Sequence, residues 1–235
     1  MIIPTYNEAE SLPILLGELS VLRKDFNYLV VDDGSPDGTA DICEKLKSEI
    51  TGLEVLNRPK KSGLGSAYRD GYRYALEKNF DAVIQIDADG SHQVSDLPNL
   101  LSKFESNPSV DLVIGSRWVK GGSVLNWSKH REALSRLANI YSNFLLGLGV
   151  KDSTAGFRIY KTSAIRKLDL NGIKSEGYCF QIEMTREIKK VGGLISEVPI
   201  TFVERQFGKS KMSGKIVIEA MLRVTYWGLL RIIRR

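Results

Sequence analysis

Runs of β-forming apolar residues alternate with helical patterns through the first half of this 235-residue chain, and this alternation constrains the fold more than any other feature. It predicts strands at residues 1–6, 27–33, 53–58, 81–89 and 110–117. It predicts helices between them at residues 11–22, 39–48, 65–78 and 95–106. Such alternation is typical of a mostly parallel sheet with helices on both faces, so we expect an α/β fold.

The second half of the chain is less regular but continues the same mixture. We expect helices at 131–148 and 178–192, strands within 152–161 and 194–205, and a mobile loop rich in glycine, serine and lysine at 205–214. The closing segment, 215–235, has a wide apolar face and predicts an amphipathic helix. We therefore divide the chain into a main domain, 1–214, and a C-terminal helix, 215–235.

Composition narrows the class of protein. The chain carries 33 Lys and Arg against 28 Asp and Glu, a net charge of +5. This mild excess suits an anionic partner such as a phosphate, a nucleotide or a membrane surface, although solubility explains it equally well. Cys43 and Cys179 lack metal-ligand spacing, so we expect packing residues in a reducing compartment. No signal peptide is visible and no apolar run reaches the roughly 18 residues of a membrane span, so we expect a cytoplasmic protein that is not integral to the membrane.

Polar residues gather where the predicted strands end, which is the edge at which ligands bind in such sheets. The positions after the first, second, fourth and fifth strands are 4–8, Asp32, Asp33, Asp87, Asp89 and Arg117. An Asp-x-Asp pair offers hard oxygen ligands to Mg2+ or Mn2+, and a divalent cation is the usual means of holding a nucleotide diphosphate against carboxylates. Taken alone, Asp-x-Asp is more often a turn or a helix cap.

Other motifs have simpler explanations. Asp33 could hydrogen-bond a base or a ribose, whereas Asp37 and Thr39 fit a turn and a helix cap. For Glu8, near a helix start, the simpler explanation is that its charge complements the helix dipole. Segment 61–71, KSGLGSAYRDG, resembles a glycine phosphate loop. It lacks the third glycine of G-x-G-x-x-G and does not follow the first strand, which argues against a Rossmann dinucleotide site.

An ordered set of motifs spans nearly the whole chain. These are PTYNE, VVDDGSPDGT, GLGSAYRDG, DADGSH, GSRW, DSTAGFRIY, GYCFQIE and ERQFGKSKMSG. The set resembles glycosyltransferase family 2 and, within it, the dolichyl- or polyprenyl-phosphate mannose synthases. The resemblance implies a GT-A fold for 1–214, a Rossmann-like α/β catalytic domain that moves mannose from GDP-mannose to a polyprenyl or dolichyl phosphate.

The resemblance also implies which residues bind the donor. The positions that match the guanosine half are Pro4, Tyr6, Glu8, Val31 and Asp33. The positions that match the metal and diphosphate segment are Asp87, Ala88 and Asp89, with Mg2+ or Mn2+ as the cofactor. Ser91 stands where some relatives supply Gln as a further metal ligand. The phosphate-binding positions are Arg117, Arg205 and Lys211, which together with Asp89 form the expected catalytic set.

The charge of the acceptor phosphate determines the mechanism that we expect. Arg131 and Ser135, one helical turn apart, could face the acceptor phosphate together with Arg117, although a solvated helix face is nearly as good an explanation. A lipid monophosphate is already anionic at neutral pH and needs no general base. We assign neither His92 nor His130 as a base and expect direct displacement with inversion at the sugar. Positioning and stabilisation of the leaving GDP would supply the rate.

The predicted C-terminal helix carries residues that suit a lipid surface. Tyr226 and Trp227 suit a membrane interface, and the basic residues suit lipid headgroups; these are Arg223, Arg231, Arg234 and Arg235. Glu219 and Arg223 make spanning costly. We expect a helix on the cytoplasmic face of a membrane, with a helix packed on the domain as the alternative. Docking on a separate membrane subunit is a further alternative, and we expect no nucleic acid partner.

Three other functions fit part of the sequence. A phosphoryl-accepting receiver domain also uses acids at strand ends, but it expects the acidic pair after the first strand and a chain about half as long. A nucleotide-sugar binder without catalysis would keep the donor motifs. Within the enzyme class, the runner-up is transfer of glucose or another sugar from UDP to a polyprenyl phosphate.

Overall fold

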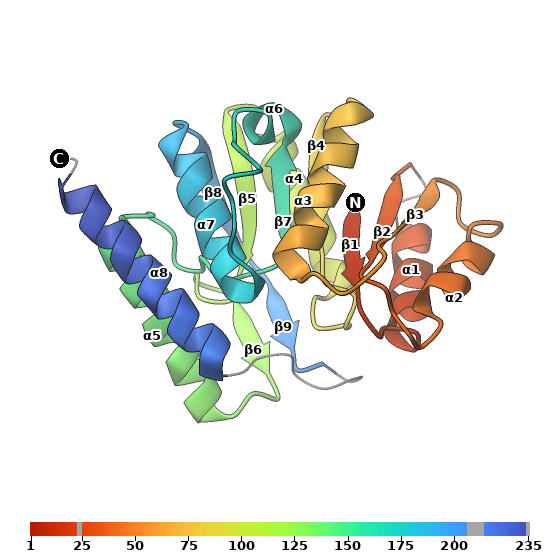
Figure 1. The fold of residues 1–235 in the computed structure, drawn as a ribbon, viewed down its shortest axis with the longest axis horizontal. Helices are drawn as coiled ribbons and strands as arrows, with labels where there is room; N and C mark the ends of the chain where they lie inside the picture. Colours follow the sequence, from red (N-terminus) through yellow and green to blue (C-terminus); the bar gives the residue numbers. More distant parts are fainter. Residues whose placement is uncertain (23–24, 206–213, 234–235) are drawn as a thin grey trace.

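The computed structural model describes residues 1–22, 25–205 and 214–233. In this described part, a seven-stranded sheet forms the centre of the molecule, with strand order β3-β2-β1-β4-β7-β5-β8 (Figure 1). Its strands are β1 (Ile2–Thr5), β2 (Tyr28–Asp32), β3 (Leu53–Asn57), β4 (Ala82–Gln85), β5 (Val110–Ser116), β7 (Arg158–Lys161) and β8 (Leu194–Pro199). Its pairs are parallel except those of β7, which runs antiparallel between β4 and β5. The predicted α/β fold is confirmed.

Helices cover both faces of the sheet (Figure 1). One face carries α1 (Ser11–Leu22), α2 (Thr39–Leu46) and, after the short 3-10 helix η1 (Val94–Asp96), α4 (Leu97–Glu105). The other carries α3 (Leu64–Glu77), α6 (Thr162–Ile165) and α7 (Gly177–Lys190). Successive strand residues point to opposite faces, so Ile2 joins one core and Ile3 the other.

The segment predicted as one strand at 194–205 is two strands in different sheets. β8 ends at Pro199, and β9 (Thr201–Val203) then pairs in parallel with β6 (Ser123–Leu125). Proline has no backbone N–H with which to continue the hydrogen-bond ladder of a sheet. The pairing partner of the chain therefore changes here, from β5 before Pro199 to β6 after it. The crossing is fixed by Ser123, whose N–H donates to the Ile200 carbonyl at 3.0 Å. This small second sheet lies below the main one, between it and α5 (Figure 1).

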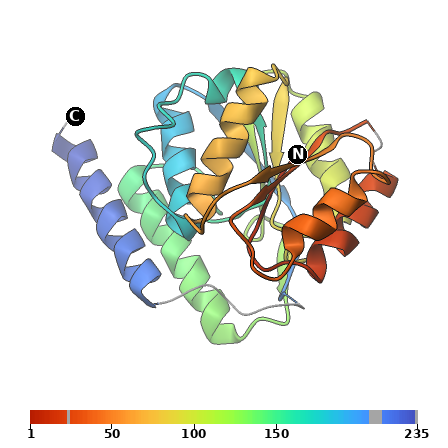
Figure 2. The ribbon, with the colours of Figure 1, turned by 45° about the vertical axis from the view of Figure 1, so that its right-hand side comes forward.

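Two helices lie side by side at one side of the molecule, α5 (Lys129–Leu146) and α8 (Gly214–Ile233) (Figures 1 and 2). Both were predicted, with boundaries two residues different or less. α5 begins after Ser128, whose hydroxyl accepts the Arg131 N–H, and ends at Gly147, which has a φ of 60°. None of the helices in the described ranges is both long and apolar enough to cross a membrane.

Both helices present apolar side chains to solvent. On α5 the exposed ones are Leu134, Leu137, Ile140 and Phe144, and on α8 they are Ile218, Met221, Leu222, Tyr226, Leu229, Ile232 and Ile233. Trp227 was expected at an interface and is buried instead, beside Val224, because it lies on the face of α8 that packs against the domain. Arg231 likewise donates to the Leu145 carbonyl at 3.2 Å.

Candidate active site

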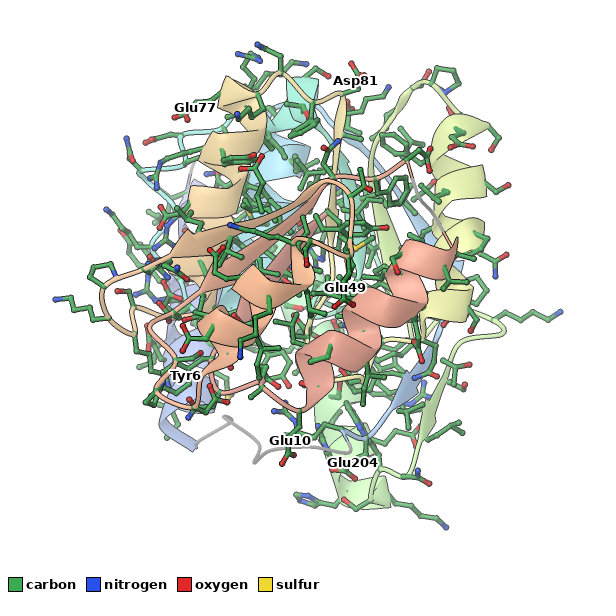
Figure 3. All side chains as sticks on the ribbon, turned by 90° about the vertical axis from the view of Figure 1, so that its right-hand side faces the viewer. Tyr6, Glu10, Glu49, Glu77, Asp81 and Glu204 are labelled. Carbon is green, nitrogen blue, oxygen red and sulfur yellow. The ribbon has the colours of Figure 1, made fainter. Side chains whose placement is uncertain are left out.

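The predicted site residues follow strands that end at the same edge of the sheet. β1, β2, β4 and β5 run in one direction, so the residues after them meet there. Figure 3 shows Tyr6 and Glu204 at this end of the molecule, and Glu77 and Asp81 at the opposite end. The structure therefore brings these residues to one edge of the sheet, as the sequence predicts.

Asp87 and Asp89 follow β4 and have different neighbours. The Tyr68 hydroxyl donates to Asp87 Oδ1 at 2.9 Å. Ser91 donates to Asp89 Oδ1 from its hydroxyl at 2.5 Å and from its N–H at 3.1 Å. Partial burial raises the pKa of Asp87, with His92 opposing the rise and the Asp89 charge adding to it. Burial is the largest cause of this rise and repulsion from Asp89 adds to it, so a bound cation would stabilise the ionised pair.

Asp87 and Asp89 suit a divalent cation whose remaining ligands come from the substrate and from water. In the part of the chain that the structure describes, no group of three or more His, Cys, Asp or Glu side chains could hold a metal. Two carboxylates plus phosphate oxygens and water are nevertheless a common set for Mg2+. Ser91 is buried and its hydroxyl proton is used on Asp89, so the structure gives it an orienting contact. Its metal ligation stays a prediction.

His92 is buried beside the acidic pair. Its ring lies against Phe157 and Phe202, with ring centroids 5.5 and 5.1 Å away, and neither ring nitrogen has a hydrogen-bond partner. Nδ1 is 3.9 Å from Asp87 Oδ2. Burial lowers the pKa of His92, although the nearby acidic charges oppose this. A neutral imidazole packed between two rings is a packing residue beside the acidic pair, in line with the expectation that His92 is not a base.

Asp33 is buried and its carboxylate organises the segment after β3. It accepts the N–H of Ser62 at 2.9 Å and that of Gly63 at 2.8 Å, and Arg58 Nη1 lies 2.7 Å away. Segment 58–63 is thereby held against the end of β2. The predicted contact of Asp33 with a base or ribose stays a prediction.

Most of the remaining donor positions are buried. Pro4, Glu8, Val31 and Ala88 belong to this group. The Tyr6 ring lies under the Lys61 ammonium, 3.8 Å from its centroid. Glu8 accepts the Ser11 hydroxyl at 2.9 Å.

Arg117 is a buried and strongly anchored cation at this edge. Its Nε and Nη2 each lie 2.7 Å from an oxygen of Asp152, a bidentate pair in which the two side chains are 3 % and 0 % exposed. Thr154 accepts a further Nη2 hydrogen bond at 2.8 Å. Trp118, Trp127 and Phe202 surround the guanidinium at 5.3 to 5.5 Å. In the described part of the chain Nη1 has no hydrogen-bond partner, so Arg117 keeps donors for an anion.

The other predicted cations lie nearby. Arg131 stacks 4.0 Å over the Trp127 ring and pairs with Glu204 at 2.5 Å. Arg205 Nη2 pairs with Asp89 Oδ2 at 3.1 Å, at the acidic pair itself. Ser135 lies one turn after Arg131 on α5, as predicted. Lys211 and most of the predicted loop at 205–214 lie outside the described residues.

The glycine loop at the start of α3 has a ligand within the chain. The Glu176 carboxylate accepts the N–H of Gly65 at 2.6 Å and pairs with Arg69 at 3.2 Å. A Cβ at Gly63, where φ is 101°, would lie 2.4 Å from a Glu176 oxygen. The glycines therefore admit a carboxylate at the helix N-terminus, which agrees with the sequence argument against a dinucleotide site.

Sequence reasoning missed the hydrogen-bond partners of the arginines. Asp152, Thr154 and Glu204 all contact predicted site residues, and none was predicted to do so. Asp152 and Thr154 lie in the motif DSTAGFRIY, so their place in the ordered set was the available signal. Glu204 directly precedes Arg205, but nothing in the local pattern indicated a partner on α5.

Comparison with known proteins finds relatives over nearly the whole chain. The family model described as glycosyl transferase family 2 matches residues 1–169. An undecaprenyl-phosphate mannosyltransferase of Micrococcus luteus is 50 % identical over 228 residues, which cover 97 % of this chain and 93 % of that protein. A polyprenol monophosphomannose synthase of Mycolicibacterium smegmatis is 45 % identical over 230 residues, covering 97 % of this chain and 86 % of that protein.

Solved structures support the fold. Glucosyl-3-phosphoglycerate synthase from Mycobacterium tuberculosis, in complex with Mn2+ and UDP-glucose, superposes with a TM-score of 0.70 at 18 % identity. The similarity covers 96 % of this chain and 78 % of that one. At this identity the comparison shows a shared fold and carries no statement about substrate.

Proposed function

The chain belongs to glycosyltransferase family 2, and from this premise we propose that it transfers mannose from GDP-mannose to a polyprenyl or dolichyl phosphate, giving a β-linked lipid phosphate mannose. The observation that carries the proposal is a set of arginines at the edge of the sheet that holds Asp87 and Asp89: Arg205 pairs with Asp89, and Arg117 and Arg131 share the Trp127 ring. The two mannosyltransferase relatives, at 50 % and 45 % identity, support mannose as the sugar.

Charge complementarity supports two anionic substrates. A nucleotide diphosphate needs cations, and a divalent ion held by Asp87 and Asp89 would supply electrostatic stabilisation of the leaving diphosphate. Arg205 already lies at Asp89, 3.1 Å away, where it can contact the same phosphates. Arg117 and Arg131 share the Trp127 ring, and their guanidinium groups suit the acceptor phosphate.

The reaction is written as one displacement. An oxygen of the acceptor phosphate forms a bond to the sugar C1 as the bond from C1 to the donor diphosphate breaks, and that electron pair leaves with GDP. The phosphate oxygen is anionic, so no side chain has to remove a proton. His92, with a lowered pKa and no exposed nitrogen, suits this absence of a base. Attack opposite the leaving group inverts C1.

The lipid acceptor explains the apolar faces of α5 and α8. Four large apolar residues on α5 are 40 % to 81 % exposed, and α8 presents a longer row beside them. We propose that these two helices lie on the cytoplasmic surface of a membrane, with α8 also packed on the domain through Val224 and Trp227. Arg131, at the start of α5, is then carried by the same helix as the side chains that face the membrane.

A donor panel tests the sugar and the base. The purified chain is incubated with Mn2+, a prenyl phosphate and either GDP-mannose, UDP-glucose or UDP-mannose, and the lipid product is identified by mass. The proposal expects a hexosyl lipid phosphate from GDP-mannose and at most a trace from the other donors. Equal or better transfer from UDP-glucose would instead establish the alternative, a glucosyltransferase. Release of GDP without a lipid product would contradict transfer.

Flotation tests the membrane surface. The full chain and the double variant Ile140→Ser/Phe144→Ser are mixed with anionic liposomes and centrifuged through a density step. Both positions are exposed on α5, at 66 % and 81 %, so the substitutions leave the core intact. The proposal expects the full chain to float and the variant to float less. Unchanged flotation of the variant would rule out this face of α5 as a contact.

A further inference from the structure

Two consecutive residues hold both halves of the site. Glu204 Oε1 pairs with Arg131 Nη1 at 2.5 Å, and Arg205 Nη2 pairs with Asp89 Oδ2 at 3.1 Å. Arg131 lies at the start of α5, on the acceptor side, and Asp89 lies in the loop after β4, on the donor side. The peptide bond between Glu204 and Arg205 therefore links the two sides directly.

The backbone at this point is fixed from both directions. The Val203 N–H donates to the Ser91 carbonyl at 3.0 Å, and the Glu204 N–H donates to the Leu125 carbonyl at 3.1 Å. His92 and Phe202 form a further backbone bridge. β9 is thus hydrogen-bonded both to the acidic loop and to β6. A shift at the Glu204–Arg131 pair or at the Arg205–Asp89 pair is transmitted through this short segment.

Each of these two ion pairs places a protein charge where a substrate charge is expected. The Glu204 carboxylate lies on an arginine that we assign to the acceptor phosphate. The Arg205 guanidinium lies on a carboxylate that we assign to the cation of the donor diphosphate. The Glu204 and Arg131 side chains are 43 % and 23 % exposed, so water reaches the pair and a phosphate can replace the carboxylate. Stacking on Trp127 keeps the Arg131 guanidinium in place when Glu204 leaves.

We propose that Glu204 is an internal competitor for the acceptor phosphate, released when the donor binds. The proposal rests on the transfer reaction proposed above. A cation and diphosphate bound at Asp89 would draw Arg205 onto the donor phosphates. The hydrogen bonds hold the N–H groups of Val203 and Glu204, so this movement turns the peptide bond after Glu204 and loosens the contact of the Glu204 carboxylate with Arg131. The acceptor phosphate then meets an arginine without its internal anion, so the donor binds before the acceptor.

A purely orienting role for Glu204 predicts the opposite change in the KM for the acceptor. If the carboxylate only held Arg131 in position, its neutralisation would misplace the guanidinium and weaken the acceptor. If it competes, neutralisation strengthens the acceptor. The direction of one change in KM therefore separates the two roles.

Steady-state kinetics of Glu204→Gln provides this test, with Glu132→Gln as the matched control. Glu132 pairs with Arg136 at 2.8 Å on the same helix and is 35 % exposed, but it contacts none of the assigned residues. We expect the KM for the prenyl phosphate to fall roughly two- to fivefold in Glu204→Gln, in line with an exposed ion pair, with the KM for GDP-mannose unchanged. The control variant keeps both values. An unchanged or raised acceptor KM in Glu204→Gln overturns the proposal.

Calorimetry measures, without turnover, how donor binding affects acceptor binding. Farnesyl phosphate is titrated into each protein with and without GDP and Mn2+. In the wild type, GDP and Mn2+ should tighten its binding; in Glu204→Gln, binding should be tighter from the start and respond less. An equal response in both proteins overturns the coupling. A wild type that transfers normally while Glu204→Gln changes nothing refutes this inference alone, whereas a wild type that transfers no sugar to any prenyl phosphate refutes the proposed function.

Discussion

The buried pair of Arg117 and Asp152 makes the sharpest prediction about stability. Asp152→Asn keeps the shape of the side chain and removes its charge, which leaves a guanidinium that is 3 % exposed without its counter-ion. Removal of one partner of a buried pair costs about 3 to 5 kcal/mol. Asn retains one acceptor oxygen, so we expect a loss near the lower end, about 3 kcal/mol. Urea unfolding followed by tryptophan fluorescence measures this loss.

The matched control is Glu132→Gln, which breaks an exposed i,i+4 pair with Arg136 on α5. Pairs of that kind contribute about 0.3 to 0.5 kcal/mol, so the control should unfold almost as the wild type does. If Asp152→Asn also lies within about 1 kcal/mol of the wild type, the reasoning from burial is refuted.

The pH dependence of the same pair has a definite sign. Burial raises the pKa of Asp152, but the charge and hydrogen bonds of Arg117 more than offset this, and the pKa lies below its ordinary value. A depressed carboxyl pKa contributes stability above the unfolded pKa of about 4, and that contribution is lost as pH falls through the folded pKa. The wild type should therefore lose stability below about pH 4 more steeply than Asp152→Asn, and parallel curves would contradict the assignment.

Three further variants test other parts of the site. Asp87→Asn should raise the free energy of unfolding of the metal-free protein near pH 7, because a carboxyl with a raised pKa costs stability when ionised; a lower thermal midpoint would count against this. Ser91→Ala removes the hydroxyl that donates a hydrogen bond to Asp89 Oδ1. This should weaken Mn2+ binding about 10-fold or more in a calorimetric titration, whereas unchanged binding would show that the hydroxyl is dispensable. Glu176→Gln should cost about 1 kcal/mol in urea unfolding through weaker capping of α3, with no cost if the contact is incidental.

The sequence predicted the parts of this fold that depend on local pattern. The alternation of strands and helices predicted the parallel sheet, and the acids after the second and fourth strands were expected at the edge where the structure has them. The family motifs then pointed to Arg117 and Arg205. These signals succeed because hydrophobic periodicity and the direction of parallel strands are encoded within short segments.

Long-range pairings could not be predicted in the same way. β7 was expected as a strand, but its antiparallel place between β4 and β5 depends on which partners remain when the other strands have paired. The Glu204 contact with Arg131 joins residues 73 positions apart. Trp227 illustrates the same difficulty on a smaller scale. An amphipathic pattern does not say which of two apolar faces of α8 packs on the domain.

The central claim is that Asp89 holds the cation of the donor diphosphate at the end of β4. Its most direct test is the rate of mannosyl transfer by Asp89→Ala, measured in a single turnover with GDP-mannose, a prenyl phosphate and saturating Mn2+. The account predicts a loss of about 100-fold or more, because the leaving diphosphate loses a preorganised charge. Transfer at near the wild-type rate, with a divalent metal still required, would contradict it.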